Sequence, residues 1–230
     1  MGTTKAAQAI IDTLNSKSAL KMEVFALSKT VFATFKEELK KVAKTLEKGV
    51  VKSKGVIEIE YIERGEYEAE LRFAGDVLIF YLHTNIFRFE KDHPLNKTPY
   101  IKKDKSRNFY SMISIYNFLT DSFKYNRTND LGYLIARIFV NREQHFFVEG
   151  ERSTDLKQKD FGKRVIDTAA MKNIIEEAIL DTLDFDLLTP PYDRVKEVTV
   201  DAMKEATNYL KLKTGKRIGF TFQADNIKPE

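Results

Sequence analysis

The segment 97–110 holds the residues of this sequence that are best suited to bind an anion. Its positively charged residues are Lys97, Lys102, Lys103, Lys105 and Arg107, and its one acidic residue is Asp104. Tyr100, Phe109 and Tyr110 are interleaved with them. Basic residues mixed with aromatic ones are typical of surfaces that bind a phosphate backbone or a small anion. A solvated loop whose lysines serve solubility has the same composition, so both interpretations stay open. The binding candidates of this loop are Tyr100, Lys102, Lys103, Lys105 and Arg107.

Arg137 is the second candidate, because it lies in an otherwise apolar strand-like segment, 131–140. Strand alternation predicts that it shares one face with Tyr133, Ile135 and Phe139. An uncompensated charge on such a face is costly, so Arg137 needs a partner. A protein carboxylate is one solution, and the carboxylate or phosphate of a ligand is the other. We therefore take Arg137 and Tyr133 as further binding candidates.

Catalytic motifs are weak in this sequence. Ser18 and Lys21 have the Ser-x-x-Lys spacing of some serine acyl-transfer enzymes, and Lys213-Thr214-Gly215 follows much later, but the Ser-Asp-Asn element of such sites is absent. Lys-Thr-Gly is also an ordinary signal for the end of a helix. Neither standard glycine-rich phosphate loop occurs. We predict no catalytic residues, while an enzyme whose site is built from scattered residues stays an alternative.

Metal-ligating residues are few and badly spaced. The chain has no Cys and three His, and His83, His93 and His145 fall in separate segments without paired spacing. An acidic group at Glu177, Asp181 and Asp184 lies opposite the apolar stripe of a predicted helix, as a solvated face would. We therefore predict that the chain holds no metal and no cofactor.

Composition places the chain among globular proteins. Of its 230 residues, 43% are hydrophobic and 31% are charged, which excludes a disordered tail or a multi-span membrane protein. The net charge of +4 is too small to indicate a dedicated nucleic-acid binder. The apolar run from Val77 to Leu82 is far shorter than the ~20 residues that span a bilayer. The absence of Cys fits a reducing compartment, so we expect a cytoplasmic protein without a membrane partner.

Apolar periodicity predicts the elements that position these candidates. Spacings of three and four from Leu20 to Leu46 predict a long helix, with a break near Asn15-Ser16 that separates it from a short leading helix. From residue 57 apolar residues recur at every second position, as in a β-hairpin with one face exposed to solvent. The later strands are apolar on both faces, which indicates that both sides of the sheet are covered or that the sheet curls.

The expected fold is a single α+β domain, 1–230, built on an antiparallel β-meander of about seven strands, one of them at 122–125. Residues 1–50 and 162–212 are predicted to be helical, with two C-terminal helices in the second range, and 55–150 to form the sheet. A final strand is predicted at 217–223. Residues 91–108 lack periodicity and are predicted to form a long loop.

These residues favour a non-catalytic binding domain. Its expected ligand is a partner protein or a small anion held between the sheet and the helices. Nucleic-acid binding through the basic and aromatic loop 97–110 is the first alternative. Salt dependence of binding separates the two, because counterion release makes nucleic-acid affinity fall steeply with salt.

Overall fold

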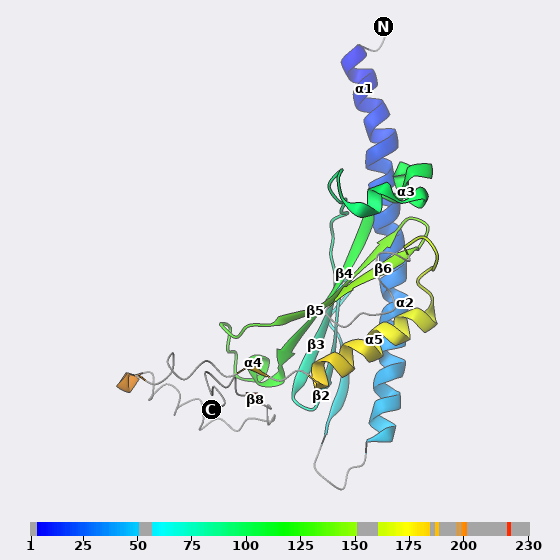
Figure 1. Ribbon diagram of the computed structural model, residues 1–230. Coiled ribbons are helices and arrows are strands. Elements are labelled where there is room, and N and C mark those ends of the chain that lie inside the picture. The colour runs from blue at the N-terminus through cyan, green and yellow to red at the C-terminus, as the bar shows by residue number, and fades with distance from the viewer. Residues whose placement is uncertain are drawn as a thin grey trace, which may run out of the picture.

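The N-terminal helix is the longest element of the fold. The computed structural model describes residues 4–50, 57–150 and 161–184, with short pieces at 187–188, 197, 199–201 and 220–221. Three consecutive elements form one unbroken rod: α1 (Lys5–Thr13), the π-helical segment η1 (Leu14–Ser18) and α2 (Ala19–Gly49) (Figure 1). The predicted break near Asn15 is therefore wrong, because a π turn carries the helix through this point without ending it.

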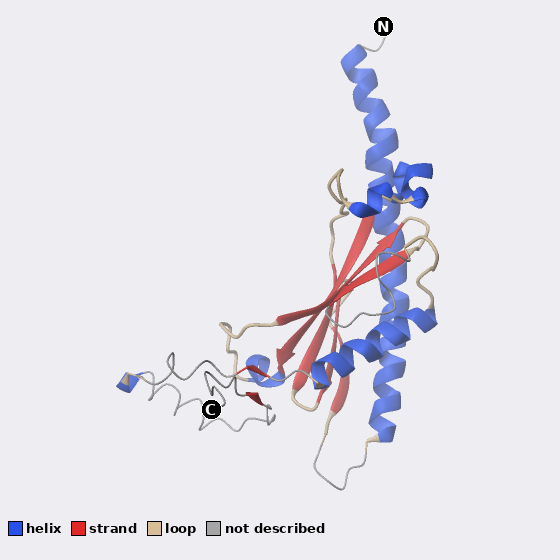
Figure 2. Ribbon diagram, viewed as in Figure 1, coloured by secondary structure: helices blue, strands red, loops and turns tan. Residues whose placement is uncertain are grey.

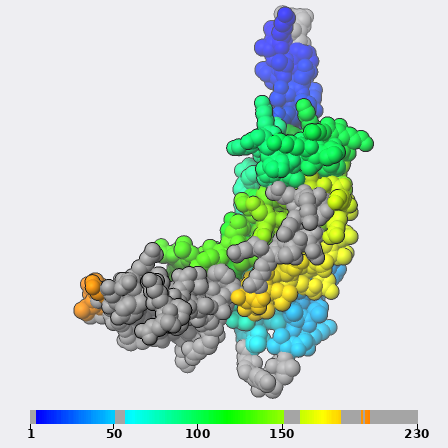
Figure 3. All heavy atoms as spheres, viewed as in Figure 1, coloured from blue at the N-terminus to red at the C-terminus, as the bar shows by residue number. Residues whose placement is uncertain are grey.

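The helices α1 and α2 of this rod differ in how much of their surface is buried. The inward stripe of α2 is buried at Val24, Ser28, Val31, Phe32, Phe35, Glu38, Leu39, Val42 and Ala43. In contrast, α1 has no buried residue, and its apolar side chains Ile10 and Ile11 are 60% and 42% exposed. Figure 3 shows α1 standing clear of the rest of the molecule. The stripe of α2 belongs to the core, whereas α1 projects from it.

A six-stranded antiparallel meander forms the sheet, in the order β1-β2-β3-β4-β5-β6. The strands are β1 (Ile59–Glu63), β2 (Glu68–Phe73), β3 (Asp76–Leu82), β4 (Tyr110–Leu119), β5 (Tyr133–Asn141) and β6 (Phe146–Gly150). Residues 122–124 of the predicted strand 122–125 instead belong to the short helix α4 (Thr120–Lys124), and Tyr125 is its C-cap. Thr120 Oγ1 donates to the carbonyl oxygen of Asp76, and Asp121 lies in the first turn, where a carboxylate favours helix.

The C-terminal part described by the structure contains one long helix. This helix, α5 (Thr168–Leu183), begins after Asp167, whose side chain accepts a hydrogen bond from the amide of Ala170. Beyond it, β7 (Leu187–Leu188) pairs in parallel with β8 (Phe220–Thr221), which falls within the predicted final strand. The second predicted C-terminal helix lies almost entirely outside the described residues. No described helix is both long enough and apolar enough to cross a membrane.

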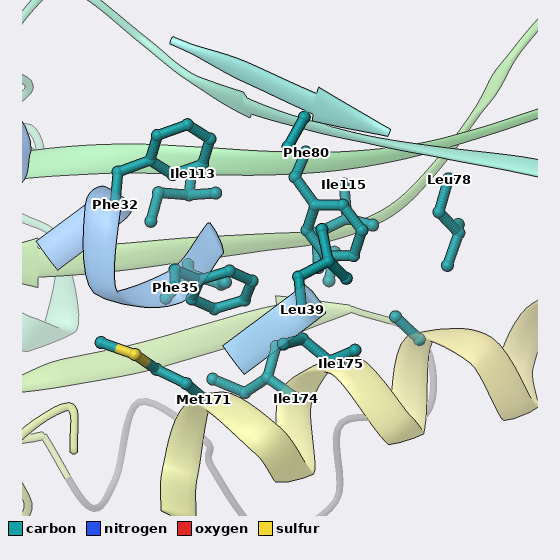
Figure 4. Packing of buried hydrophobic residues seen from close by; sticks show 14 of the residues in the cluster. Phe32, Phe35, Leu39, Leu78, Phe80, Ile113, Ile115, Met171, Ile174 and Ile175 are labelled. Carbon is teal, nitrogen blue, oxygen red and sulfur yellow. The ribbon is translucent and has the colours of Figure 1, made fainter. Parts of the chain in front are cut away.

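The main core lies between the sheet and the two long helices α2 and α5. Figure 4 shows side chains from four elements meeting there: Phe32, Phe35 and Leu39 from α2, Leu78 and Phe80 from β3, Ile113 and Ile115 from β4, and Met171, Ile174 and Ile175 from α5. Each of these side chains is at most 2% exposed, so α2 and α5 cover this face of the sheet. Burial of so many large apolar groups is the principal force that holds the helices on the sheet.

A second, smaller core lies on the opposite face, at one end of the sheet. It contains Leu95, Ile101, Tyr110, Phe139, Phe147 and Phe161. Leu95 and Ile101 come from the segment 84–109, which contains the predicted loop 91–108. This segment contains three short helices: η3 (Pro94–Lys97), α3 (Pro99–Lys103) and η4 (Lys105–Arg107) (Figure 2). The later strands are apolar on both faces because each face packs against one of these two cores.

Candidate anion-binding cleft

An open cleft of about 630 Å³ lies where the rod passes the segment 84–109. We call it the basic cleft. Its cations are Lys17, Arg88, Lys105 and Arg142, its one carboxylate is Glu23, its neutral polar residues are Asn15, Ser16 and Ser106, and its apolar residues are Ala19, Leu20 and Phe109. Four cations against one carboxylate make the electrostatic potential of the cleft positive.

Only one of the four cations in the basic cleft has a carboxylate partner among the described residues. Arg142 Nη2 lies 3.1 Å from Glu23 Oε1, and Arg142 Nη1 donates to Ser106 Oγ at 3.0 Å. Arg88 lies over the ring of Phe109, with its guanidinium carbon 5.1 Å from the ring centroid. Lys17 and Lys105 are exposed and form no ion pair within the described parts of the chain. The unpaired cations of the cleft leave its positive charge available to a ligand.

A capped turn fixes the loop side of the cleft. Asp104 Oδ1 accepts a hydrogen bond from the amide of Ser106 at 2.8 Å and caps η4. The hydrogen bonds from Ser106 lower the pKa of Asp104, which keeps the cap ionised. Lys105 and Ser106 are thus held at the cleft by the local chain as well as by Arg142.

The π-helical segment forms the opposite side. Three of its five residues, Asn15, Ser16 and Lys17, line the cleft. A π turn changes the direction of the side chains that follow it, and such turns occur frequently at functional sites. If residues 14–18 were α-helical instead of π-helical, the rod would turn a different set of side chains toward the segment 84–109.

Tyr100 and Arg107, two of the predicted binding residues, form a structural latch. The Tyr100 hydroxyl donates to Glu143 Oε2 at 2.7 Å and accepts from Asn141 Nδ2 at 2.9 Å. Arg107 Nε lies 3.0 Å from Glu143 Oε1, and its guanidinium covers the Tyr100 ring at 4.4 Å. Burial opposes ionisation of Glu143, but the hydrogen bonds from Tyr100 and Arg107 outweigh it and lower its pKa. This latch ties the loop to the turn between β5 and β6.

The remaining loop candidates are solvent-exposed. Lys102 and Lys103 end α3 and have no carboxylate partner among the described residues, and Lys105 lines the basic cleft. The structure therefore brings Lys105 into the cleft, keeps Lys102 and Lys103 beside it on α3, and uses Tyr100 and Arg107 to hold the loop in place.

Arg137 has a protein partner. Its Nη2 lies 2.8 Å from Oε2 of Glu149, the residue directly opposite on β6. Both side chains are partly exposed, 39% for Arg137 and 48% for Glu149. The sequence left open whether a protein carboxylate or a ligand pairs with Arg137, and the structure shows a protein carboxylate. The pair lies on a part of the sheet that solvent reaches.

A β-bulge separates Arg137 from Tyr133. The register of β4 and β5 shifts between Ile115 and Tyr116, so that Arg137 lies opposite Ser114 and Tyr133 opposite Asn117. Positions 114 and 117 are an odd number of residues apart on one strand and point to opposite faces. The prediction that Tyr133 shares a face with Arg137 is therefore wrong. It is correct only for Phe139, which lies two residues after Arg137 on the same side of the bulge.

Sequence reasoning missed Lys17, Arg88 and Arg142. They come from the rod, from the segment after β3 and from the turn between β5 and β6, so no spacing in the sequence connects them. In the part of the chain that the structure describes, no group of three or more His, Asp or Glu residues is placed to hold a metal ion.

Comparison of this chain with protein families, with curated proteins and with solved structures finds no match.

Proposed function

We propose that this chain is a non-catalytic binding domain whose basic cleft holds a small anionic ligand between the N-terminal helix and the end of the sheet. The observation that carries the proposal is the convergence of Lys17, Arg88 and Lys105, none of which has a carboxylate partner among the described residues. Like charges brought together repel one another, and an anion in the cleft would relieve this repulsion.

The kinds of donor in the cleft favour an oxyanion. Arg88 and Arg142 offer planar groups with several N–H donors, which suit the oxygens of phosphate or carboxylate. Lys17 and Lys105 add mobile point charges with three N–H donors each. Because the capped turn already fixes the backbone beside Lys105, this part of the cleft would not have to be ordered when the ligand binds.

Charge reversal with inorganic phosphate as the probe tests this proposal. Lys105→Glu and Arg88→Glu should each lower phosphate affinity about tenfold or more in a calorimetric titration at low salt, because each replaces an attractive charge by a repulsive one. Lys44→Glu is the matched control, since Lys44 is an exposed lysine near the far end of α2 and makes the same change in net charge. Equal affinities in all three variants would refute the proposed cleft.

Nucleic-acid binding by the same end of the molecule is the second candidate. Lys102 and Lys103 are exposed on α3 beside the cleft, so they would extend its positive surface along a polyanion. If this candidate is correct, a single-stranded oligonucleotide should bind with a salt slope of about −0.7 per phosphate contacted. The double variant Lys102→Ala/Lys103→Ala should flatten that slope, measured by fluorescence anisotropy across a series of salt concentrations.

A further inference from the structure

The basic cleft has an apolar side as well as a charged one. Ala19 and Leu20 begin α2 and line the cleft directly after the π-helical segment. Phe109 lies beneath Arg88 and is only 6% exposed, so it forms the floor rather than a free surface. Ala19 is exposed and Leu20 half-buried. We call Ala19, Leu20 and Phe109 the apolar wall.

The size of the cleft indicates a ligand larger than a bare oxyanion. A volume of about 630 Å³ is many times that of a phosphate ion and falls within the range of small-molecule sites. A phosphate bound at the cations would leave Ala19 and the exposed part of Leu20 in water. An organic group attached to the phosphate would cover this wall and gain free energy from its burial.

We propose that the ligand of the basic cleft is a phosphomonoester whose phosphate contacts Lys17, Arg88 and Lys105 and whose organic group lies on the apolar wall. This inference rests on the proposed function of the cleft. A phosphomonoester carries a charge of about −1.5 to −2 near neutral pH, which suits a site with several unpaired cations better than the single charge of a carboxylate does.

Phenyl phosphate and inorganic phosphate form the pair of probes for this inference. At pH 8 both are mainly dianions, so they differ chiefly in the apolar ring. Calorimetric titration of the full chain should show phenyl phosphate binding about tenfold more tightly, because only its ring covers the apolar wall.

Two substitutions locate the effect of the ring. Leu20→Ala should lower the affinity for phenyl phosphate several-fold and leave that for inorganic phosphate unchanged. Ala19→Gln makes an exposed residue of the same wall polar without changing its charge, and it should abolish the preference for the ring even if Leu20→Ala disturbs the helix. Met22→Ala is the matched control, because Met22 is on the same helix, is 68% exposed and does not line the cleft.

The outcomes separate this inference from the function on which it rests. Equal affinities for the two probes, both weakened by Lys105→Glu, would overturn the apolar wall and leave a plain phosphate site. A preference for phenyl phosphate that survives both wall substitutions would also overturn it. If the unaltered chain binds neither probe, the proposed function fails together with the inference.

Discussion

Removal of one hydroxyl from the structural latch should destabilise the fold measurably. Tyr100→Phe deletes the oxygen that donates to Glu143 Oε2 and accepts from Asn141 Nδ2. The ring remains beneath Arg107 and keeps its edge contact with Phe161, with ring centroids 5.3 Å apart. The substitution therefore isolates the two hydrogen bonds from the packing of the ring.

The size of the loss follows from what each partner retains. Glu143 keeps its contact with Arg107 at 3.0 Å, and Asn141 Nδ2 keeps a longer hydrogen bond to the carbonyl oxygen of Arg107 at 3.4 Å. A hydrogen bond to a charged group contributes about 1.5 to 3 kcal/mol, and a neutral one about 1 kcal/mol. Because both partners are partly compensated, we expect the free energy of unfolding to fall by about 2 kcal/mol.

Urea denaturation followed by circular dichroism measures this loss. Tyr110→Phe is the matched control, because Tyr110 is fully buried and its hydroxyl has no hydrogen-bond partner among the described residues. Its removal should leave the free energy of unfolding unchanged or slightly higher. If Tyr100→Phe is as stable as the unaltered chain, or if the two variants lose equal stability, the latch does not hold the loop as we describe.

Acid should weaken the latch, because the pKa of Glu143 is lower in the folded chain than its ordinary value. A carboxylate with a lowered pKa stabilises the fold above its unfolded pKa, about 4.3, and loses this contribution as the pH falls through its folded pKa. The stability difference between the unaltered chain and Glu143→Gln should therefore be largest near neutral pH and shrink below about pH 4. A difference that stays constant down to pH 3 would contradict this assignment.

Three further substitutions test other parts of the fold and the cleft. Gly162→Ala should destabilise the chain by about 1 to 3 kcal/mol in urea denaturation, because Gly162 has φ +90° and an added Cβ would lie 2.6 Å from Tyr100 Cγ. Phe35→Ala removes a fully buried ring of the main core and should cost about 3 to 5 kcal/mol in the same assay. Glu23→Gln removes the carboxylate that pairs with Arg142 and should raise phosphate affinity several-fold in calorimetry, whereas an unchanged affinity would show that Arg142 takes no part in binding.

Much of the fold could be predicted because its signals are periodic. The stripe of α2 and the alternation of the strands are both dictated by burial of one face, and α2 and the six strands of the meander have the predicted type. The segment 122–125 could not be assigned from so short a pattern, since four residues fit a strand or one helical turn equally well. The bulge beside Ala136 was also invisible, because one inserted residue leaves the composition of a strand unchanged.

The cleft was only partly predictable for a different reason. Lys105 stood out because its neighbours in the sequence are also basic. Arg107 belongs to the same charge run, yet it forms an ion pair with Glu143, which lies on a distant turn. The sequence shows where the cations are, but tertiary contacts decide their partners. Only the fold therefore distinguishes Arg107, which is paired, from Lys105, which has no carboxylate partner among the described residues.

The N-terminal rod runs without interruption from α1, which projects from the molecule, to the basic cleft. The nine residues of α1 rise about 1.5 Å each, so this helix extends roughly 13 Å beyond the π-helical segment. Residues Asn15 to Lys17 lie at the base of α1, in the π-helical segment, and also form one side of the cleft. The same three residues therefore join α1 to α2 and bind the ligand in our proposal, so a ligand in the cleft would contact the junction itself.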